Sequence, residues 1–240
     1  MSVSGCSLVS AHHQKFNHRN LTFNLIMRVL ILGSTGLVGN EVLKKLVENK
    51  SVESITTITR SKVEIENEKI KQVVLPLDQW FTDSNNFKDI DVAISSFGTT
   101  RAAAGGIDNF KKIDYGTNLD FAKACKSQEV SKFILVSTGM ANPNSMFPYL
   151  RIKGELERDI EALGFDDYFF LRPGGLIGKR KPGKSKGFGE GLMQKLGVHW
   201  PFSLAIRPTK VEIIADYINL LISKEGKKVC EYDDIMNSKV

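Results

Sequence analysis

The sequence predicts an α/β protein: a doubly wound parallel sheet with a small C-terminal lobe. The apolar run 29–32 leads into three glycines spaced three apart, and an amphipathic stretch follows at once. That order is typical of a strand, a tight turn and a helix. Further strand-like runs alternate with helical stretches, as in parallel α/β folds. The pattern loosens after Leu176, where Pro and Gly interrupt a basic run.

These patterns indicate one domain over residues 27–240, in which residues 176–210 form a mobile substrate lobe. After the first helix, we expect strands at 55–59, 73–78 and 132–138, and strands with their exit loop or turn at 91–100 and 168–175. We expect helices at 113–126, from Pro148 onward and at 211–222, and a last strand at 229–235. Residues 101–106 would form a small-residue flap over a ligand or a plain loop.

Composition limits the classes of function. The 240 residues carry a net charge of +6 and are 42% hydrophobic, and no apolar run approaches the roughly 20 residues of a membrane span. A phosphorylated small molecule suffices to explain the charge, so no specific nucleic acid is expected. The basic run 179–186 could bind an acidic partner, although a solvated loop is its default interpretation.

Cysteine and histidine usage argues against metal and disulfide chemistry. The three cysteines are far apart with no Cys-x-x-Cys, and His199 is the only histidine beyond the N-terminal tail. We therefore expect no metal site, a reducing compartment and a cytoplasmic protein.

Residues 1–26 differ from the rest, because they are rich in Ser, His and Asn and contain no acidic residue. They are either a disordered extension, which we favour, or a weak targeting segment. In the second case the protein would be mitochondrial.

The glycine turn has the features of a dinucleotide site. Gly33 allows a sharp turn off the strand, Gly36 lets a phosphate approach the backbone, and Gly39 lets the helix pack on the strand. The amides and dipole at the helix start favour a pyrophosphate. The residues expected to contact the cofactor here are Gly33, Ser34, Thr35, Gly36, Leu37, Val38 and Gly39.

Arg60 indicates which dinucleotide binds. An acid about 20 residues after the last glycine would bind the ribose of NAD, but no acid lies between Ser54 and Val63. Arg60 suits a 2′-phosphate through its charge and its fork of donors, so we expect NADP(H). Asp78 could accept a hydrogen bond from adenine, or could cap a helix.

The exit of the 91–100 strand should lie beside the glycine turn, because strand order reverses between the first and fourth strands of this fold. Ser96, Phe97 and Gly98 fall at that exit. We therefore expect these three residues to contact the cofactor.

Tyr149 and Lys153 lie four residues apart on one helical face. An ammonium beside a phenol favours the phenolate, and such a tyrosine can give or take a proton at a carbonyl or alcohol oxygen. Lys153 can also hold the cofactor ribose. A hydroxyl from Ser137 or Thr138 could orient the same oxygen.

Several motifs occur together, namely Gly33-x-x-Gly36-x-x-Gly39, Ser137-Thr138, Tyr149-x-x-x-Lys153 and Arg172-Pro173-Gly174. This combination resembles the extended and atypical short-chain dehydrogenase/reductases. Residues 97–101, 153–157 and 171–174 more narrowly resemble the Tat-interacting-protein-like branch and its bacterial and fungal relatives. The resemblance covers roughly residues 27–222.

The resemblance implies a Rossmann fold with NADP(H), and a carbonyl or alcohol as substrate. It implies Tyr149 as proton donor or acceptor, Lys153 as ribose binder, and Ser137 or Thr138 as carbonyl partner. Pro173 is expected beside the cofactor, and a homodimer built partly from the Tyr149 helix is a family expectation. Asp114 stands where many extended members carry Asn, which puts a proton relay there in doubt. Some members of the branch are regarded as cofactor-dependent regulators, so a sensor without turnover remains an alternative.

Overall fold

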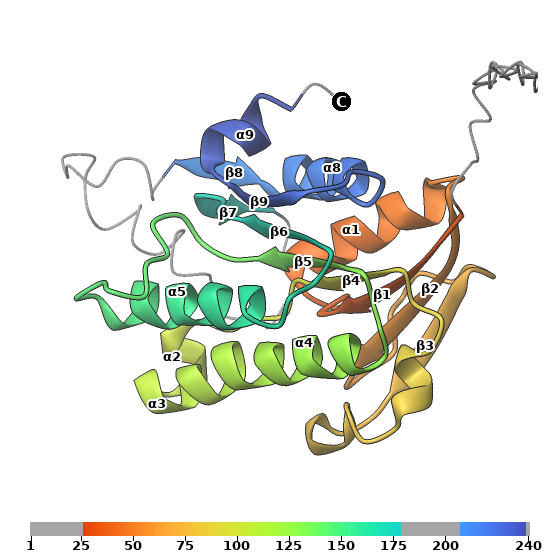
Figure 1. The fold of residues 1–240 in the computed structure, drawn as a ribbon, viewed down its shortest axis with the longest axis horizontal. Coiled ribbons are helices and arrows are strands. Elements are labelled where there is room, and N and C mark those ends of the chain that lie inside the picture. Colours follow the sequence, from red (N-terminus) through yellow and green to blue (C-terminus); the bar gives the residue numbers. More distant parts are fainter. Residues whose placement is uncertain (1–25, 179–206, 239–240) are drawn as a thin grey trace, which may run out of the picture.

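A computed structural model describes residues 26–178 and 207–238. Its centre is a parallel sheet of seven strands in the order β3-β2-β1-β4-β5-β6-β9 (Figure 1). The strands of the sheet are β1 (Met27–Leu32), β2 (Val52–Thr59), β3 (Ile70–Val74), β4 (Val92–Ser95), β5 (Lys132–Val136), β6 (Asp167–Leu171) and β9 (Lys227–Cys230). The α/β doubly wound prediction is confirmed.

Helices cover both faces of the sheet. One face carries α1 (Leu37–Glu48), α8 (Val211–Leu221) and α9 (Tyr232–Met236), and the other carries α4 (Thr117–Ser127) and α5 (Pro148–Glu161) (Figure 1). Because successive strand side chains point to opposite faces, Val29 and Ile31 pack toward α1 and α8. Leu30 and Leu32 pack toward α4 and α5.

The chain between β4 and α4 is broken into short helical pieces. These are α2 (Arg101–Ala104), α3 (Ile107–Phe110) and a π-helical segment (Lys111–Gly116). Two 3₁₀ turns, Leu77–Gln79 and Ser84–Phe87, come between β3 and β4. The expected flap at 101–106 is therefore mostly the short, surface helix α2, which begins at the Thr100 cap.

Strand order reverses next to β1, as the sequence predicts. The chain moves from β1 outward to β2 and β3, then returns to place β4 on the other side of β1. In this arrangement Leu32 pairs with Ile58 on one side and with Ser95 on the other. The carboxyl ends of these strands define the crevice where ligands bind in open α/β sheets.

A second, two-stranded parallel sheet follows β6. It pairs β7 (Gly175–Ile177) with β8 (Pro208–Lys210). Most of the expected substrate lobe, including the basic run 179–186, lies outside the described residues.

Several predicted strands have the wrong boundaries; the one expected at 132–138, for example, is β5 and ends at Val136. The strand expected at 73–78 is β3 and ends at Val74, because Pro76 has no N–H for the ladder and a 3₁₀ turn follows. The strand expected at 229–235 is β9, which begins at Lys227 and ends at Cys230. Residues 232–236 are instead helix α9, which begins at a capping box formed by Glu231 and Asp234.

Arg172 fixes α5 to the end of β6. Its guanidinium donates to the buried Glu157 carboxylate on α5, with one N–O distance of 2.5 Å, and to Glu231 at 2.8 Å. Burial alone would lower the pKa of Arg172. The two carboxylates raise it by more than burial lowers it, so the pKa lies above its usual value. The arginine of the Arg-Pro-Gly motif therefore has a structural role, joining α5, β6 and the start of α9.

We expect Arg172→Met to destabilise the protein strongly, because it leaves the Glu157 carboxylate buried without its cation. Loss of one partner of a buried pair typically costs about 3–5 kcal/mol. The matched control is Arg158→Met, since Arg158 is exposed and pairs with the partly exposed Asp159. Urea unfolding should show a large drop in midpoint for the first variant and little change for the second. Equal midpoints for the two variants would contradict this role.

Candidate active site

The glycine turn packs directly against the exit of β4. Gly33 directly follows β1 and has a φ of 92°, a conformation that favours glycine. A Cβ added at Gly33 would lie 2.6 Å from the backbone nitrogen of Phe97, and one at Gly39 would lie 2.2 Å from the carbonyl oxygen of Gly33. The sequence-predicted sharp turn and close helix packing are thus both present, and neither position tolerates a side chain.

The start of α1 fits a phosphorylated ligand. Its cap residue, Gly36, offers no side-chain hydrogen bond, and no acidic residue lies in the first turn, so the first amides remain available as donors. Ser34 is fully buried, and its Oγ has no hydrogen-bond partner among the described residues. Leu37 and Val38 direct their side chains into the core, which leaves only their backbone to face a ligand. Thr35 is half-buried in the turn.

The three residues predicted after β4 lie beside this turn. The Ser96 hydroxyl donates to the Leu32 carbonyl at 3.1 Å, and Phe97 packs edge-on against Trp80 with ring centroids 5.3 Å apart. Gly98 lies against Asp114, because an added Cβ would be 3.3 Å from Asp114 Oδ1. The exit of β4 therefore joins the glycine turn to the π-helical segment.

Arg60 and Asp78 lie on the surface. Arg60 directly follows β2 and is exposed, as expected of a residue that would meet a 2′-phosphate at the strand end. Asp78 is also exposed, but it lies within the 3₁₀ turn Leu77–Gln79, whose cap is Pro76. The alternative interpretation of Asp78 as a helix N-cap is therefore wrong.

Tyr149 and Lys153 occupy the same face of α5, one turn apart. The Tyr149 ring lies 5.3 Å from the Phe110 ring between centroids, and the residue is 37% exposed. Lys153 is only 5% exposed. The pair therefore combines a reachable phenol with a buried ammonium.

Lys153 forms an ion pair with Asp114, which is 1% exposed. The second oxygen of Asp114 accepts the backbone N–H of Thr99 at 2.7 Å. Burial lowers the pKa of Lys153, but attraction to Asp114, then Tyr149, then Glu157, more than offsets burial, so that pKa lies above its usual value. Lys153 is thus an ammonium held by a carboxylate.

Ser137 and Thr138 follow β5 at the same edge of the sheet. Ser137 is buried, its N–H donates to the Leu171 carbonyl at 2.8 Å, and its Oγ has no hydrogen-bond partner among the described residues. Thr138 is half-buried. Pro173 is buried close by, and its carbonyl accepts the N–H of Gly139 at 2.9 Å.

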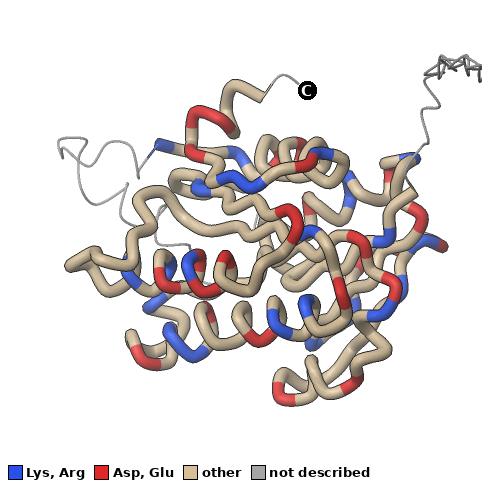
Figure 2. The backbone as a smooth tube through the Cα atoms, in the orientation of Figure 1, with Lys and Arg blue, Asp and Glu red and all other residues tan. Residues whose placement is uncertain are grey.

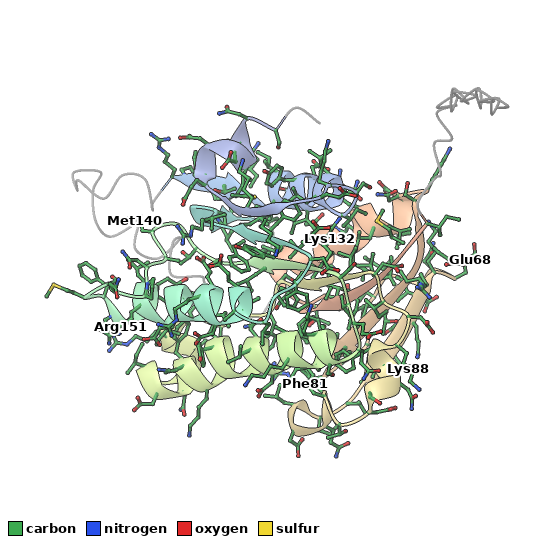
Figure 3. All side chains as sticks on the ribbon, viewed as in Figure 1. Glu68, Phe81, Lys88, Lys132, Met140 and Arg151 are labelled. Atoms are coloured by element: carbon green, nitrogen blue, oxygen red, sulfur yellow. The ribbon has the colours of Figure 1, made fainter. Side chains whose placement is uncertain are left out.

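The carboxyl end of β5 lies on the same side of the molecule as the start of α5. In Figure 3, Lys132 at the start of β5 and Met140 beyond its end lie at opposite ends of the strand. The end near Met140 is also where α5 begins (Figure 1). Ser95 at the end of β4 pairs with Leu135 in β5, so Ser137 and the exit of β4 lie at the same edge of the sheet. Asp114 links this edge to α5, because it accepts the Thr99 N–H and pairs with Lys153.

Asn118 is fully buried, and no role was predicted for it from the sequence. Its amide donates to the carbonyls of Asp114 at 2.6 Å and Phe97 at 3.2 Å, and its oxygen accepts from the Ser95 hydroxyl. Two features of the sequence could have indicated this role. Asn118 lies four residues after Asp114, and it is a polar residue on the apolar face of the helix that includes Phe121. Asn118 ties the end of β4 to the π-helical segment.

Two further contacts hold the π-helical segment to α5. Lys111 pairs with Glu155 at 3.2 Å, and the Tyr115 hydroxyl donates to Asp159 at 2.6 Å. The hydrogen bond to Asp159, with burial, raises the pKa of Tyr115 to about 12. Together with the Asp114–Lys153 pair, these contacts set how α5 lies against the segment.

Other kinds of site are not seen in the described part. Within residues 26–178 and 207–238, no group of three or more His, Cys, Asp or Glu could hold a metal ion. Among the same residues, no helix has the length and apolar character to cross a membrane. Figure 2 shows basic and acidic positions interspersed along α4 and α5 rather than separated by sign.

Comparison with known proteins gives the family. A family model described as HIM1 matches residues 40–195. A relative from Meyerozyma guilliermondii, named Protein FMP52, mitochondrial, is 47% identical over 171 residues, covering 71% of this chain and 73% of the relative. The protein of the same name from Candida albicans is 44% identical over 179 residues, covering 71% and 76%.

Solved structures confirm the fold. A UDP-glucose 4-epimerase from Thermotoga maritima with UDP-glucose matches with TM-score 0.64 and 20% identity, covering 85% of this chain and 75% of that one. MoeE5 in complex with UDP-glucose and NAD matches with TM-score 0.65 and 15% identity, covering 84% and 74%. At these identities the likeness concerns the Rossmann-like fold alone.

The expectation of a cytoplasmic protein is contradicted, because these relatives are named mitochondrial. That expectation rested on cysteine usage, which reports a reducing environment and does not distinguish one reducing compartment from another. The family match and the identities above show that the chain belongs to the HIM1 family, together with the FMP52 proteins, and the solved structures show that it has a Rossmann-like fold.

Proposed function

We propose that the chain is an NADP(H)-dependent oxidoreductase of the short-chain dehydrogenase/reductase type, acting on a carbonyl or alcohol. The observation that carries this proposal is the chain of contacts from the glycine turn through the β4 exit and Asp114 to Lys153, with the buried Ser137 hydroxyl just after the neighbouring strand β5. The narrower resemblance to the Tat-interacting-protein-like branch is compatible with the same chemistry.

The cofactor would be held along the carboxyl edge of the sheet. The α1 amides and Ser34 would bind the pyrophosphate, and Arg60 the 2′-phosphate. When bound, the nicotinamide would supply or accept the hydride. Ser96, Phe97, Gly98 and Pro173 would line its path along the sheet edge.

The reacting oxygen would be handled by this chain's own hydroxyls. Tyr149 is reachable from solvent and would give its proton to a carbonyl oxygen, or take one from an alcohol. The Ser137 hydroxyl, which is buried without a partner among the described residues, would donate to the same oxygen. Thr138 is the alternative donor. Lys153 would hold the ribose with the N–H groups that Asp114 does not occupy.

A second candidate is an NADPH-binding regulator without turnover. The observation that favours it is the ion pair between Lys153 and Asp114. The carboxylate balances the charge of the ammonium, so Lys153 attracts a phenolate at Tyr149 less strongly. The relatives' names assign no activity. Catalysis and binding therefore have to be measured separately.

We expect Tyr149→Phe to leave NADPH binding intact and to lower turnover by about 10²-fold or more, because the proton donor is lost. Calorimetric titration with NADPH and NADH, followed by a carbonyl screen that reads the absorbance of reduced cofactor, measures both. NADPH binding with no carbonyl turned over, and no effect of Tyr149→Phe, would support the regulator instead.

We expect Arg60→Glu to weaken NADPH binding by at least about tenfold while leaving NADH binding nearly unchanged, because a charge-assisted contact to phosphate contributes about 1.5–3 kcal/mol. Lys88→Glu is a matched control, since Lys88 is exposed and precedes β4, away from the strand ends that bind ligands (Figure 3). Equal NADPH affinity in wild type and Arg60→Glu would refute the assignment of NADP(H).

We also propose that the protein is mitochondrial, as its relatives are named, and that residues 1–26 act as the targeting segment. That stretch is basic and contains no acidic residue, as transit segments are. A fusion of residues 1–26 to a fluorescent protein should localise to mitochondria in yeast cells. Diffuse fluorescence from the fusion would show that this segment is not the signal.

A further inference from the structure

Asp114 joins two parts of the proposed site. One carboxylate oxygen accepts the Thr99 N–H at 2.7 Å, at the exit of β4, and the other contacts the Lys153 ammonium on α5. Gly98 lies against it, since a Cβ there would be 3.3 Å from Oδ1. Any group that reaches both the β4 exit and Lys153 therefore lies beside this carboxylate.

The pair carries no net charge. The pKa of Lys153 lies above its usual value, although burial alone would lower it, because Asp114 attracts the ammonium. The other groups that act on Lys153 are Tyr149 and Glu157, both on α5. Glu157 is itself paired with Arg172 at 2.5 Å. Among the described residues, Asp114 is thus the carboxylate that balances Lys153.

The two redox forms of a nicotinamide differ in charge at the ring. The oxidised ring is a cation and the reduced ring is neutral, while both forms carry the same phosphates. A lysine without a counter-ion would repel the oxidised ring and leave the reduced ring unaffected. The ratio of the two affinities therefore reports the charge beside the ring, because the phosphate contribution cancels.

We propose that Asp114 is a specificity-determining residue that sets the preference between NADP⁺ and NADPH, by cancelling the charge of Lys153 so that the oxidised cofactor is accepted. This inference rests on the proposed function, since it requires a nicotinamide at this site. It goes beyond that function because it gives a role to Asp114, which stands where many extended short-chain dehydrogenase/reductases carry Asn.

The test is a double-mutant cycle of Asp114 and Lys153 in the intact protein. Calorimetric titration with NADP⁺ and NADPH at pH 6 measures both affinities. Asp114→Asn leaves the ammonium unbalanced and should raise the ratio Kd(NADP⁺)/Kd(NADPH) about tenfold, or about 1.4 kcal/mol. Lys153→Met leaves a bare carboxylate and should lower the ratio. The double variant restores neutrality and should return the ratio to the wild-type value.

The pH dependence separates a charge effect from a packing effect. Without Asp114, burial dominates and the pKa of Lys153 falls. The ratio for Asp114→Asn should therefore return toward the wild-type value as pH rises and the lysine loses its proton. A change in packing alone would give a ratio that does not depend on pH.

Asp159→Asn is the matched control, because it removes an equal charge at the boundary between α5 and the π-helical segment, where it pairs with Tyr115 and not with Lys153. Its ratio should equal that of wild type. Binding of both nucleotides with an unchanged ratio in Asp114→Asn at pH 6 would overturn the inference and leave the proposed function standing. Failure of wild type to bind either nucleotide would overturn both. If circular dichroism shows that Asp114→Asn is unfolded, the ratio measured for Lys153→Met decides. A ratio below that of wild type supports the inference, and an equal or higher ratio overturns it.

Discussion

The close packing of the glycine turn on the exit of β4 is the constraint on which the site depends. The Gly33 carbonyl lies where a Cβ on Gly39 would be, and the Gly33 Cα faces the backbone of Phe97. This contact brings the start of α1, with its free amides, next to the loop that leads to Asp114. A side chain at either glycine would push the turn off the sheet, and the nucleotide-binding edge would lose its shape.

The position of α5 is the second requirement, because α5 carries Tyr149 and Lys153. It is held on one side by the π-helical segment, through Lys111, Asp114 and Tyr115. On the other side Arg172 holds Glu157. Since these contacts come from two different parts of the chain, the helix that supplies the proposed proton donor is fixed against both the β4 side and the β6 side of the sheet.

Sequence patterns predicted the features that depend on near neighbours in the chain. The roles of Gly33 and Gly39 could be predicted because the strand, turn and helix are contiguous. The shared face of Tyr149 and Lys153 could be predicted because four residues make about one helical turn. The strand at 73–78 was misplaced because Pro76 stops the ladder just after β3.

Contacts between distant segments could not be predicted in the same way. The pairing of Asp114 with Lys153 depends on the π-helical register of residues 111–116, which has no clear sequence signature, and on how α5 lies across it. The role of Arg172 in holding Glu157 and Glu231 likewise requires three elements to meet. The prediction of a cytoplasmic protein was wrong because cysteine usage does not distinguish one reducing compartment from another.

The most direct test of the account is a crystal structure of the protein with NADP⁺. We expect the pyrophosphate to lie against the amides at the start of α1 and the Ser34 hydroxyl, the 2′-phosphate at Arg60, and the nicotinamide between the β4 exit and Tyr149. A nucleotide bound elsewhere, or none at saturating NADP⁺, would contradict it.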